Sequence, residues 1–431
     1  MSDNKKLPRL DLPQGLHSDT LAVREGLPAT QWGENSEALF MTSSFVHPDC
    51  ATAAARFANE QEAFVYSRFS NPTVTMMERR LAALEGTSGC IATSSGMAAI
   101  LITILSLLQS GDHVVCSRGV FGSTIKLFQD FGKFGIDTSF VSQTDVAEWR
   151  AALRPNTRLL FAETPNNPLT EVCDIRALAD VAHGHGALLL VDNCFCSPAL
   201  QQPVKFGADL VMHSGTKFLD GQGRVIAGAI CGAAELLDAK FVPAMRSAGM
   251  TLSPFNAWVV LKGLETLSVR LRAQSERALQ LARWLEQQPQ VRRVFYPGLP
   301  SHPQHALAMA QQGGVGGAVV SFELKAADVP VAMSGSAPVL PAAAPKSAGT
   351  LDTSYAPFTP RSTPKITTRS GTCTCGAARP APPISAKVSI ISLIRLAISG
   401  LPGSWTSAAR AFRTGWPMRA IFSTGSAMAS G

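Results

Sequence analysis

The sequence lacks a long hydrophobic run, and this absence excludes a membrane-spanning helix from the expected architecture. A helix that crosses a bilayer needs about 20 mainly apolar residues, whereas the longest candidate, Val388–Ile398, is much shorter and contains Arg395. The first residues, MSDNKKLPRLDL, also lack the apolar core of a signal peptide. We therefore expect a soluble, cytoplasmic protein with no membrane partner.

Cysteines at metal-ligand spacing are missing as well. The chain has nine cysteines. Cys194 and Cys196 lie beside an apolar run, and Cys373 and Cys375 have no second pair or histidine cluster nearby. Because a structural zinc site needs about four ligands, we expect no metal and mostly reduced, structural thiols.

Acidic residues are scarce in the last quarter of the chain. Residues 1–325 hold 28 lysines and arginines against 29 acidic residues, whereas residues 326–431 hold 10 against two, Asp328 and Asp352. The formal net charge of +7 therefore comes from the C-terminal stretch rather than from a basic stripe on a folded face. We expect no nucleic-acid partner.

The same stretch differs from the rest of the chain in composition. Glutamate does not occur after Glu323, 12 of the 28 prolines lie among these 106 residues, and no helical or strand period persists. We interpret residues 326–431 as an aberrant Pro/Ser/Ala-rich basic tail, produced by a frameshift or by an equivalent sequencing error. Resequencing the gene around codon 325 tests this, and a clean reading with no alternative frame would refute it.

Hydrophobic periodicity divides the remaining chain into three parts. Residues 1–62 read as an irregular arm with a short helix near Ala51–Asn59, which cannot bury itself and would pack on another subunit. Residues 63–254 alternate apolar runs with helical periods, a pattern typical of an α/β domain with a mainly parallel sheet. Residues 255–325 begin a smaller C-terminal domain that is incomplete.

The apolar runs of the large domain do not alternate with polar residues, as expected for a sheet covered on both faces. The expected strands are Cys90–Ala92, His113–Ser117, Asp137–Val141, Arg158–Glu163, Ala187–Asp192, Leu210–His213 and Ala227–Cys231. The expected helices include Thr75–Glu85, Gly96–Gln109, Gly122–Phe131 and Ile175–His183. In the smaller domain, helices are expected at Phe255–Arg270 and Arg272–Gln288, and strands at Val291–Tyr296 and Gly317–Leu324.

Two of these strands lead into charged residues. One run ends on Asp192, and the next passes through a short turn into Lys217. Because burial of an unpaired charge costs several kcal/mol, both side chains are expected at the carboxyl edge of the sheet, where α/β sheets bind ligands. A pyridoxal-phosphate site needs an amine that forms an imine and a carboxylate that keeps the pyridine nitrogen protonated. Lys217 and Asp192 fit these roles, although either residue alone could simply end a strand in solvent.

A phosphate site is predicted where Thr93-Ser94-Ser95-Gly96-Met97 follows a strand and opens a helix. Small residues and free N–H groups at a helix start can approach an anion, although an ordinary helix cap looks the same. Ser214 and Thr216 flank Lys217 and could add hydroxyl donors, or could merely form the turn.

Two aromatic positions complete the candidate set. Phe121 begins a helix after a neighbouring strand, where its ring could stack on a cofactor or pack in the core. Tyr66 and Arg68 lie two residues apart in a polar turn and could both reach a phosphate. The same motif is also typical of a surface loop.

Five motifs of the large domain occur together in a known family. They are Tyr66–Thr73, Ser94–Ile100, Glu163–Pro168, Val191–Asn193 and His213–Lys217. With them the chain resembles the Cys/Met-metabolism, cystathionine γ-synthase-like family of fold-type I pyridoxal-phosphate enzymes. It is most similar to the O-succinylhomoserine sulfhydrylase branch, on the basis of Val120–Thr124, Asp192–Cys196, Leu252–Trp258 and Gly298–His305. The resemblance runs from about residue 16 to residue 325.

The resemblance implies a role for each candidate residue. Lys217 would carry pyridoxal 5′-phosphate as an imine, and Asp192 would face the pyridine nitrogen. The phosphate would be contacted by Gly96, Met97, Ser214 and Thr216, the ring face by Phe121, and the ring hydroxyl and substrate carboxylate by Asn167. Tyr66 and Arg68 would complete the site of a neighbouring subunit, which implies a homodimer or homotetramer.

The implied reaction is γ-replacement in methionine biosynthesis, in which O-succinylhomoserine and sulfide give homocysteine and succinate. The freed amine of Lys217 would be the general base. A cystathionine γ-synthase or a methionine or cystathionine γ-lyase would use the same site, and succinyl and acetyl donors are not distinguished. An inactive remnant is a further alternative, because relatives continue past residue 325 with an arginine that grips the substrate carboxylate. Arg395 lies in an apolar run similar to the strand that carries this arginine in the family, but the residues around Arg395 do not match the family.

Overall fold

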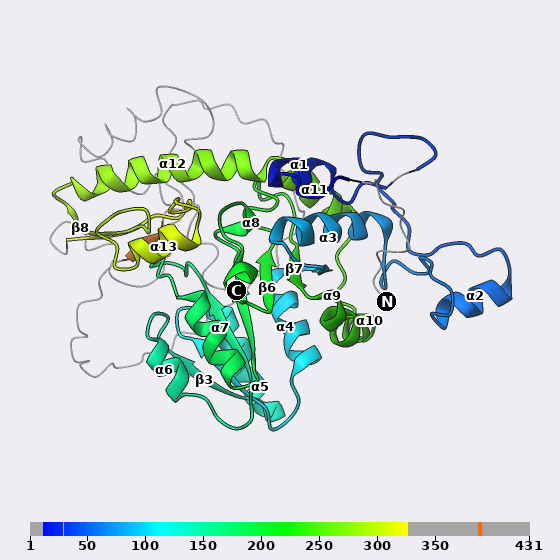
Figure 1. Cartoon of the computed structure of the whole chain (residues 1–431), viewed down its shortest axis with the longest axis horizontal. Coiled ribbons are helices and arrows are strands. Elements are labelled where there is room, and N and C mark those ends of the chain that lie inside the picture. The colour runs from blue at the N-terminus through cyan, green and yellow to red at the C-terminus, as the bar shows by residue number, and fades with distance from the viewer. Residues whose placement is uncertain (1–11, 29, 326–386, 390–431) are drawn as a thin grey trace, which may run out of the picture.

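The computed structural model describes residues 12–28, 30–325 and 387–389 of the 431-residue chain (Figure 1). Between 326 and 431, only 387–389 belong to this set. The interpretation of that tail as a frameshift product, and the question of Arg395, therefore lie outside the described residues.

A seven-stranded sheet forms the centre of the large domain. Its strands are β1 (Gly89–Thr93), β2 (His113–Ser117), β3 (Asp137–Val141), β4 (Thr157–Glu163), β5 (Leu188–Asp192), β6 (Leu210–Ser214) and β7 (Gly228–Gly232). Their order is β1-β7-β6-β5-β4-β2-β3, with β2 to β6 parallel and β7 antiparallel to both neighbours. The predicted mainly parallel sheet is confirmed, and the predicted boundaries of its seven strands lie within one residue of the observed ones. In the smaller domain, the strand predicted at Gly317–Leu324 begins only at Ser321.

Helices cover both faces of the sheet because its strands are apolar on both sides. On one face, α4 (Gly96–Leu107), α5 (Gly122–Phe131) and α10 (Val242–Ala248) bury Leu190 and Leu210. On the other, α6 (Val146–Ala151) and α7 (Ile175–Gly184) bury Leu189, and α3 (Pro72–Glu85) and α11 (Pro254–Leu264) bury Val211. The short helices α8 (Ser197–Leu200) and α9 (Ala234–Leu236) lie in connections. The 3₁₀ segments η2 (Gly132–Phe134) and η3 (Pro203–Phe206) and the π-helical η4 (Leu237–Phe241) do so as well.

The arm contains α1 (Ser18–Arg24) and α2 (Cys50–Phe57). Contrary to the expectation that only another subunit covers the arm, α1 packs against α3 of its own chain. Buried Glu37 also forms an ion pair with buried Arg80 of α3, at 2.5 Å. By contrast, α2 projects away from the sheet (Figure 1). Near it, the side chains of Val46 and Phe57 are 95% and 56% exposed.

The smaller domain is built on α12 (Leu267–Glu286), with α13 (His305–Gln311), β8 (Val291–Phe295) and β9 (Ser321–Leu324). The two helices predicted at 255–288 meet at 265–266 rather than near 271, because Thr266 has a non-helical ψ of 7° while the apolar pattern continues across it. A third strand, β10 (Lys387–Ser389), pairs antiparallel with β9. This strand forms in a stretch where no strand period persists, since backbone pairing with an open strand edge requires no side-chain period.

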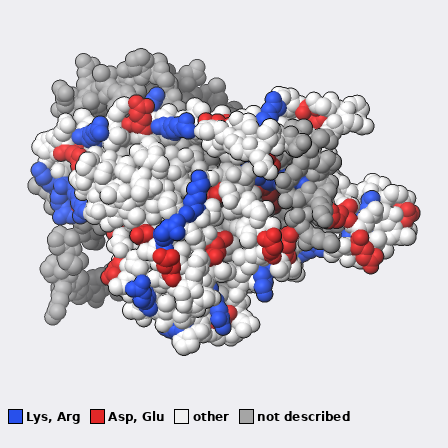
Figure 2. Space-filling model, viewed as in Figure 1, with Lys and Arg blue, Asp and Glu red and all other residues white. Residues whose placement is uncertain are grey.

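The described surface mixes charges of both signs. Figure 2 shows lysines and arginines interspersed with acidic residues over the face in view. This distribution agrees with the near-neutral balance of residues 1–325. Among the described helices, none is both long enough and apolar enough to pass through a membrane.

Candidate active site

The candidate site lies at the carboxyl ends of three neighbouring strands. β4 ends at Glu163, β5 ends at Asp192, and β6 leads through Gly215 and Thr216 to Lys217. In the register of the sheet, Glu163 lies opposite Asp192, and Asp192 opposite Met212. Because these strands are parallel, their ends meet at one edge, where an α/β sheet binds its ligand. The structure therefore brings the two predicted central residues, Asp192 and Lys217, to the same edge.

The Asp192 carboxyl group is almost fully buried, with 6% of the residue exposed. The main-chain N–H of Cys194 donates a hydrogen bond to Oδ1 at 3.0 Å. Burial raises the pKa of Asp192 to about 6, and this hydrogen bond and the positive charges of His213 and Lys217 oppose the rise. A cationic group at Asp192, such as a protonated pyridine nitrogen, would favour the ionised carboxylate in the same way.

Lys217 lies in a hydrogen-bonded turn between β6 and β7. The N–H of Gly215 donates to Ala227 O at 2.8 Å, and the N–H of Gly221 donates to Lys217 O at 2.9 Å. The residue is exposed, and its charge favours the ionised forms of both Asp192 and Glu163. The turn thus fixes the main chain of Lys217 and leaves its amine near two acids.

The start of α4 provides the predicted phosphate cradle. Gly96 and Met97 are the first two helical residues, and Ser95 caps the helix by accepting a hydrogen bond from Ala98 N at 3.0 Å. The first N–H groups of a helix have no acceptor inside it and favour an anion. A Cβ at Gly96 would lie 3.1 Å from Ser214 Cβ, so glycine allows the helix start to lie close to β6.

Ser214 and Thr216 lie on the opposite side of this cradle. Ser214 is the last residue of β6. The hydroxyl oxygen of Thr216 accepts a hydrogen bond from Ala227 N at 3.3 Å, which leaves the hydroxyl proton available to a ligand. The four predicted phosphate contacts therefore come from two elements, α4 and the end of β6, that the glycine at position 96 brings together.

Phe121 and Asn167 lie in two loops at the same edge of the sheet. Phe121 precedes α5 and is 47% exposed, so its ring is not part of the core. Glu163 Oε2 accepts a hydrogen bond from Phe121 N at 2.8 Å, and the main-chain N–H of Asn167 lies close enough to lower the pKa of the same carboxyl group. Glu163 was absent from the predicted site. The argument used for Asp192, a charged residue at the end of a buried strand, would have identified it.

A second group missed by the sequence analysis lies on the other face of the sheet, behind Asp192. His213 Nε2 and Glu85 Oε1 are 2.6 Å apart, and Asn193 Nδ2 donates to the same Glu85 oxygen at 3.0 Å. Gln201 Nε2 donates to Asn193 Oδ1 at 3.1 Å. All four side chains are buried. These contacts fix Asn193, the residue after Asp192. Hydrophobic periodicity in the sequence cannot predict them, because each partner comes from a different element.

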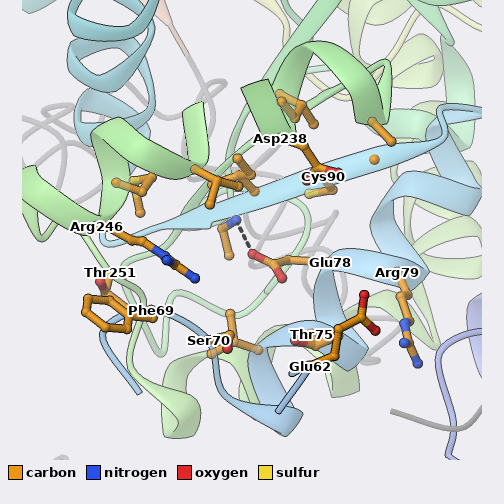
Figure 3. A pocket seen from close by; sticks show the side chains of 18 of the residues that line it. Glu62, Phe69, Ser70, Thr75, Glu78, Arg79, Cys90, Asp238, Arg246 and Thr251 are labelled. Atoms are coloured by element: carbon orange, nitrogen blue, oxygen red, sulfur yellow. Dashed lines mark hydrogen bonds between the residues drawn. The ribbon is translucent and has the colours of Figure 1, made fainter. Parts of the chain in front are cut away.

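Tyr66 and Arg68 lie apart from the other predicted site residues. The Arg68 guanidinium donates to Arg246 O and lies 4.7 Å from the Phe69 ring centre. Arg68 lines a cavity of about 740 Å³ whose lining includes none of Lys217, Asp192 or Phe121. Figure 3 shows this cavity, with Arg246 and Phe69 on one side and Glu78 hydrogen-bonded to the main chain of β1. Within one chain, the structure does not bring Tyr66 and Arg68 to Lys217.

Comparison with known sequences gives one matching family model, described as Cys/Met metabolism PLP-dependent enzyme, over residues 19–343. The match continues beyond residue 325, where the residue patterns suggested that the resemblance ends.

Three curated relatives cover similar spans. An O-succinylhomoserine sulfhydrylase of Pseudomonas aeruginosa is 58% identical over 72% of this chain and 77% of its own length. One of Mycobacterium tuberculosis is 44% identical over 73% and 77%. An L-methionine gamma-lyase of Fusobacterium nucleatum is 37% identical over 71% and 78%.

Among solved structures, metB from Corynebacterium glutamicum superposes with a TM-score of 0.69 and 34% identity. The superposition covers 73% of this chain and 80% of that one. The similarity therefore extends to the arrangement of the elements that position the site.

Proposed function

Because the chain belongs to the Cys/Met metabolism family of pyridoxal-phosphate-dependent enzymes, we propose that it catalyses γ-replacement on an O-acylated homoserine. The substrates are O-succinylhomoserine and sulfide, and the products are homocysteine and succinate, as in methionine biosynthesis. The level of identity favours this reaction over elimination, since the P. aeruginosa sulfhydrylase is 58% identical and the F. nucleatum γ-lyase is 37% identical.

The residues present at the site fit pyridoxal phosphate. The α4 start, Ser214 and Thr216 would hold the phosphate, Phe121 would face the ring, and Asn167 would lie near the ring hydroxyl. Asp192 would accept a hydrogen bond from the protonated pyridine nitrogen, and Lys217 would carry the cofactor. When bound, the cofactor stores the negative charge that develops on the amino-acid substrate.

Lys217 also moves the protons of the reaction. Its Nζ removes the proton from Cα of the substrate and exchanges one at Cβ, because it is the only amine proposed to lie against the substrate. The Cγ–O bond to succinate then breaks, and a Cγ–S bond to sulfide forms. Asp192 would stabilise the positive charge at the pyridine nitrogen, which would keep the ring able to withdraw electrons.

The observation that carries the proposal is the meeting of Asp192 and Lys217 at neighbouring strand ends, beside a helix start held open by Gly96. We expect wild-type protein to show visible absorbance with pyridoxal phosphate and a borohydride-trapped adduct on Lys217. Lys217→Ala should lose both. Lys240→Ala, at an exposed lysine outside the site, is the matched control and should keep both. A wild-type sample that stays colourless would contradict the proposal.

Product analysis identifies the reaction. Homocysteine and succinate from O-succinylhomoserine and sulfide are the expected products. Cystathionine from added cysteine would indicate a cystathionine γ-synthase, and 2-oxobutanoate with ammonia would indicate a γ-lyase. Cofactor loading without any of these products would indicate an inactive remnant. Parallel assays with the O-acetyl donor decide the acyl preference.

The proposed active unit is a dimer, or a tetramer made of two dimers, in which Tyr66 and Arg68 reach the phosphate of the neighbouring subunit. The separation of Arg68 from Lys217 within one chain supports this arrangement. So does the exposure of large apolar side chains on the arm, including Trp32 at 81%.

The division of the chain also remains a prediction, with an arm at 1–62, a cofactor domain at 63–254, a small domain from 255 to 325 and a frameshifted tail at 326–431. If the tail is translated as given, we expect weak turnover, because the family's carboxylate-binding arginine follows residue 325. Cofactor binding should survive, since its proposed contacts all precede residue 231. Normal turnover by this polypeptide would contradict the prediction.

A further inference from the structure

The site contains a buried carboxyl group that the proposed chemistry does not use. Glu163 is 2% exposed and lies directly opposite Asp192 in the β4–β5 register. Two neighbouring carboxylates in a buried site repel each other. A second acid at this position therefore requires a reason.

Its contacts supply one. Oε2 of Glu163 accepts a hydrogen bond from the N–H of Phe121 at 2.8 Å, and the N–H of Asn167 is close enough to favour the ionised form of the same carboxyl group. These two residues belong to separate loops, one before α5 and one after β4. The N-cap residue of α5, Phe121, makes no side-chain capping hydrogen bond. Among the described residues, the side chain that fixes the main chain at Phe121 is therefore that of Glu163.

The surroundings hold Glu163 itself in place. Gln143 Nε2 donates to the main-chain oxygen of Glu163 at 2.6 Å, and Ser117 Oγ donates to Gln143 Oε1 at 2.5 Å. All three residues are buried. The main chain of Glu163 is thus held from β2 and from the loop after β3, which fixes the point from which its carboxyl group extends.

We propose that Glu163 is a positioning residue that sets Phe121 and Asn167 against the cofactor through their main-chain N–H groups, acting as a neutral hydrogen-bond acceptor. In that form it leaves Asp192 as the single carboxylate opposite the pyridine nitrogen. The inference rests on the proposed function, because it assumes that Phe121, Asn167 and Asp192 face the cofactor.

Electrostatics supports the neutral form. Burial, and then the adjacent Asp192 carboxylate, raise the pKa of Glu163 well above its ordinary value, against the opposing effect of the Phe121 and Asn167 hydrogen bonds and of Lys217. A site with two close carboxyl groups favours one proton between them. Because Asp192 is the one proposed to face the cationic pyridine nitrogen, Glu163 retains the proton.

Two variants separate position from charge. Glu163→Gln is isosteric and neutral, and its amide oxygen can accept from Phe121 N, so pyridoxal-phosphate affinity should stay within about threefold of wild type. Glu163→Ala leaves the N–H of Phe121 without this acceptor, and we expect affinity to fall about tenfold or more. The visible circular dichroism per bound cofactor should also fall in Glu163→Ala, because it reports how the ring is held, and should be retained in Glu163→Gln.

Glu148 offers a matched control in the same domain. Its Oε2 accepts Ser142 N at 2.8 Å, while its Oε1 pairs with Arg118 near the surface. Glu148→Ala should lower the melting temperature without changing cofactor affinity or circular dichroism. If Glu163→Ala does not fold, Glu163→Asp, whose carboxyl group is one methylene shorter, takes its place in the comparison.

Two outcomes would overturn the inference. One is a Glu163→Ala or Glu163→Asp variant with wild-type affinity and dichroism, which would show a purely structural role. The other is a Glu163→Gln variant as defective as Glu163→Ala, which would show that the charge matters. Neither outcome affects the proposed function, which fails separately if wild-type protein forms no reducible adduct at Lys217.

Discussion

At the scale of single residues, the site follows from one physical rule. A charge at the end of a buried strand is tolerated only at the ligand edge of the sheet, and this rule identified Asp192 and Lys217 before the fold was known. The rule applies equally to Glu163, a buried acid that ends β4 beside Asp192. The network of His213, Glu85 and Asn193 could not have been predicted, because its partners converge from distant parts of the chain.

Asp192 leads to a prediction about pH and stability in the cofactor-free protein. Its pKa is raised to about 6 by burial, so the folded state binds a proton more tightly than the unfolded state. The contribution of Asp192 to the unfolding free energy should therefore be most favourable below about pH 4 and should fall as pH rises through about 6. Asp192→Asn removes the cost of burying an ionised carboxyl group, and the asparagine oxygen can still accept the hydrogen bond from Cys194 N.

We expect urea unfolding of cofactor-free Asp192→Asn at pH 8 to show a gain on the order of 3 kcal/mol over wild type. The gain should disappear near pH 4, where the wild-type carboxyl group is protonated. An equal difference between the two proteins at both pH values would contradict the assignment. The same variant should lose cofactor affinity, because the pyridine nitrogen loses its anionic partner.

At the scale of elements, strand–helix alternation was sufficient to predict the sheet, since each strand is a short apolar run and its type does not depend on its neighbours. The predicted boundary between α11 and α12 was wrong because the direction of a helix is set by packing, and the apolar stripe does not change at the bend. The close approach of β7 to the Ser95–Gly96 turn likewise could not be predicted from the sequence. A Cβ at Gly228 would lie 2.1 Å from Ser95 O.

This contact yields a prediction about the phosphate cradle. In Gly228→Ala the added methyl group meets main-chain atoms, so the Ser95–Gly96 turn must shift away from β7. We expect affinity for pyridoxal phosphate to fall about tenfold, while affinity for pyridoxal, which lacks the phosphate, changes little. Gly184→Ala, at a helical glycine with open space around its Cβ position, should leave both affinities unchanged. A parallel loss for both ligands in Gly228→Ala would place the damage outside the cradle.

At the scale of the whole molecule, the arm divides into two parts with different physical character. Residues near α1 and Glu37 are secured to α3 through burial and a buried ion pair, and breaking one partner of such a pair costs about 3–5 kcal/mol. The segment around α2 has no buried residue. Since large exposed apolar surfaces mark interfaces, this segment is where a second copy is expected. Sequence periodicity could not separate the two parts, because neither has a regular pattern.

A site built from residues of two subunits can be tested by mixing two defective variants. If Arg68 serves the phosphate of its neighbour, Lys217→Ala and Arg68→Ala chains should complement each other. Arg68→Ala alone should bind pyridoxal phosphate weakly, and Lys217→Ala alone should form no adduct. After the two are unfolded and refolded together, random pairing into symmetric dimers places an intact Lys217 opposite an intact Arg68 in about a quarter of all sites. Adduct absorbance at low cofactor concentration should recover to that fraction.

The readout depends only on cofactor loading, so it holds whether or not the chain turns over substrate. Co-refolding Lys217→Ala with Lys240→Ala controls for dilution, and should give adduct in proportion to the Lys240→Ala chains alone. Absence of recovery in the Arg68→Ala mixture, with dimers present by mass, would mean that Arg68 acts on the site of its own chain. In that case the loop carrying it must move relative to Lys217, since Lys217 is not among the residues that line the cavity next to Arg68 within one subunit.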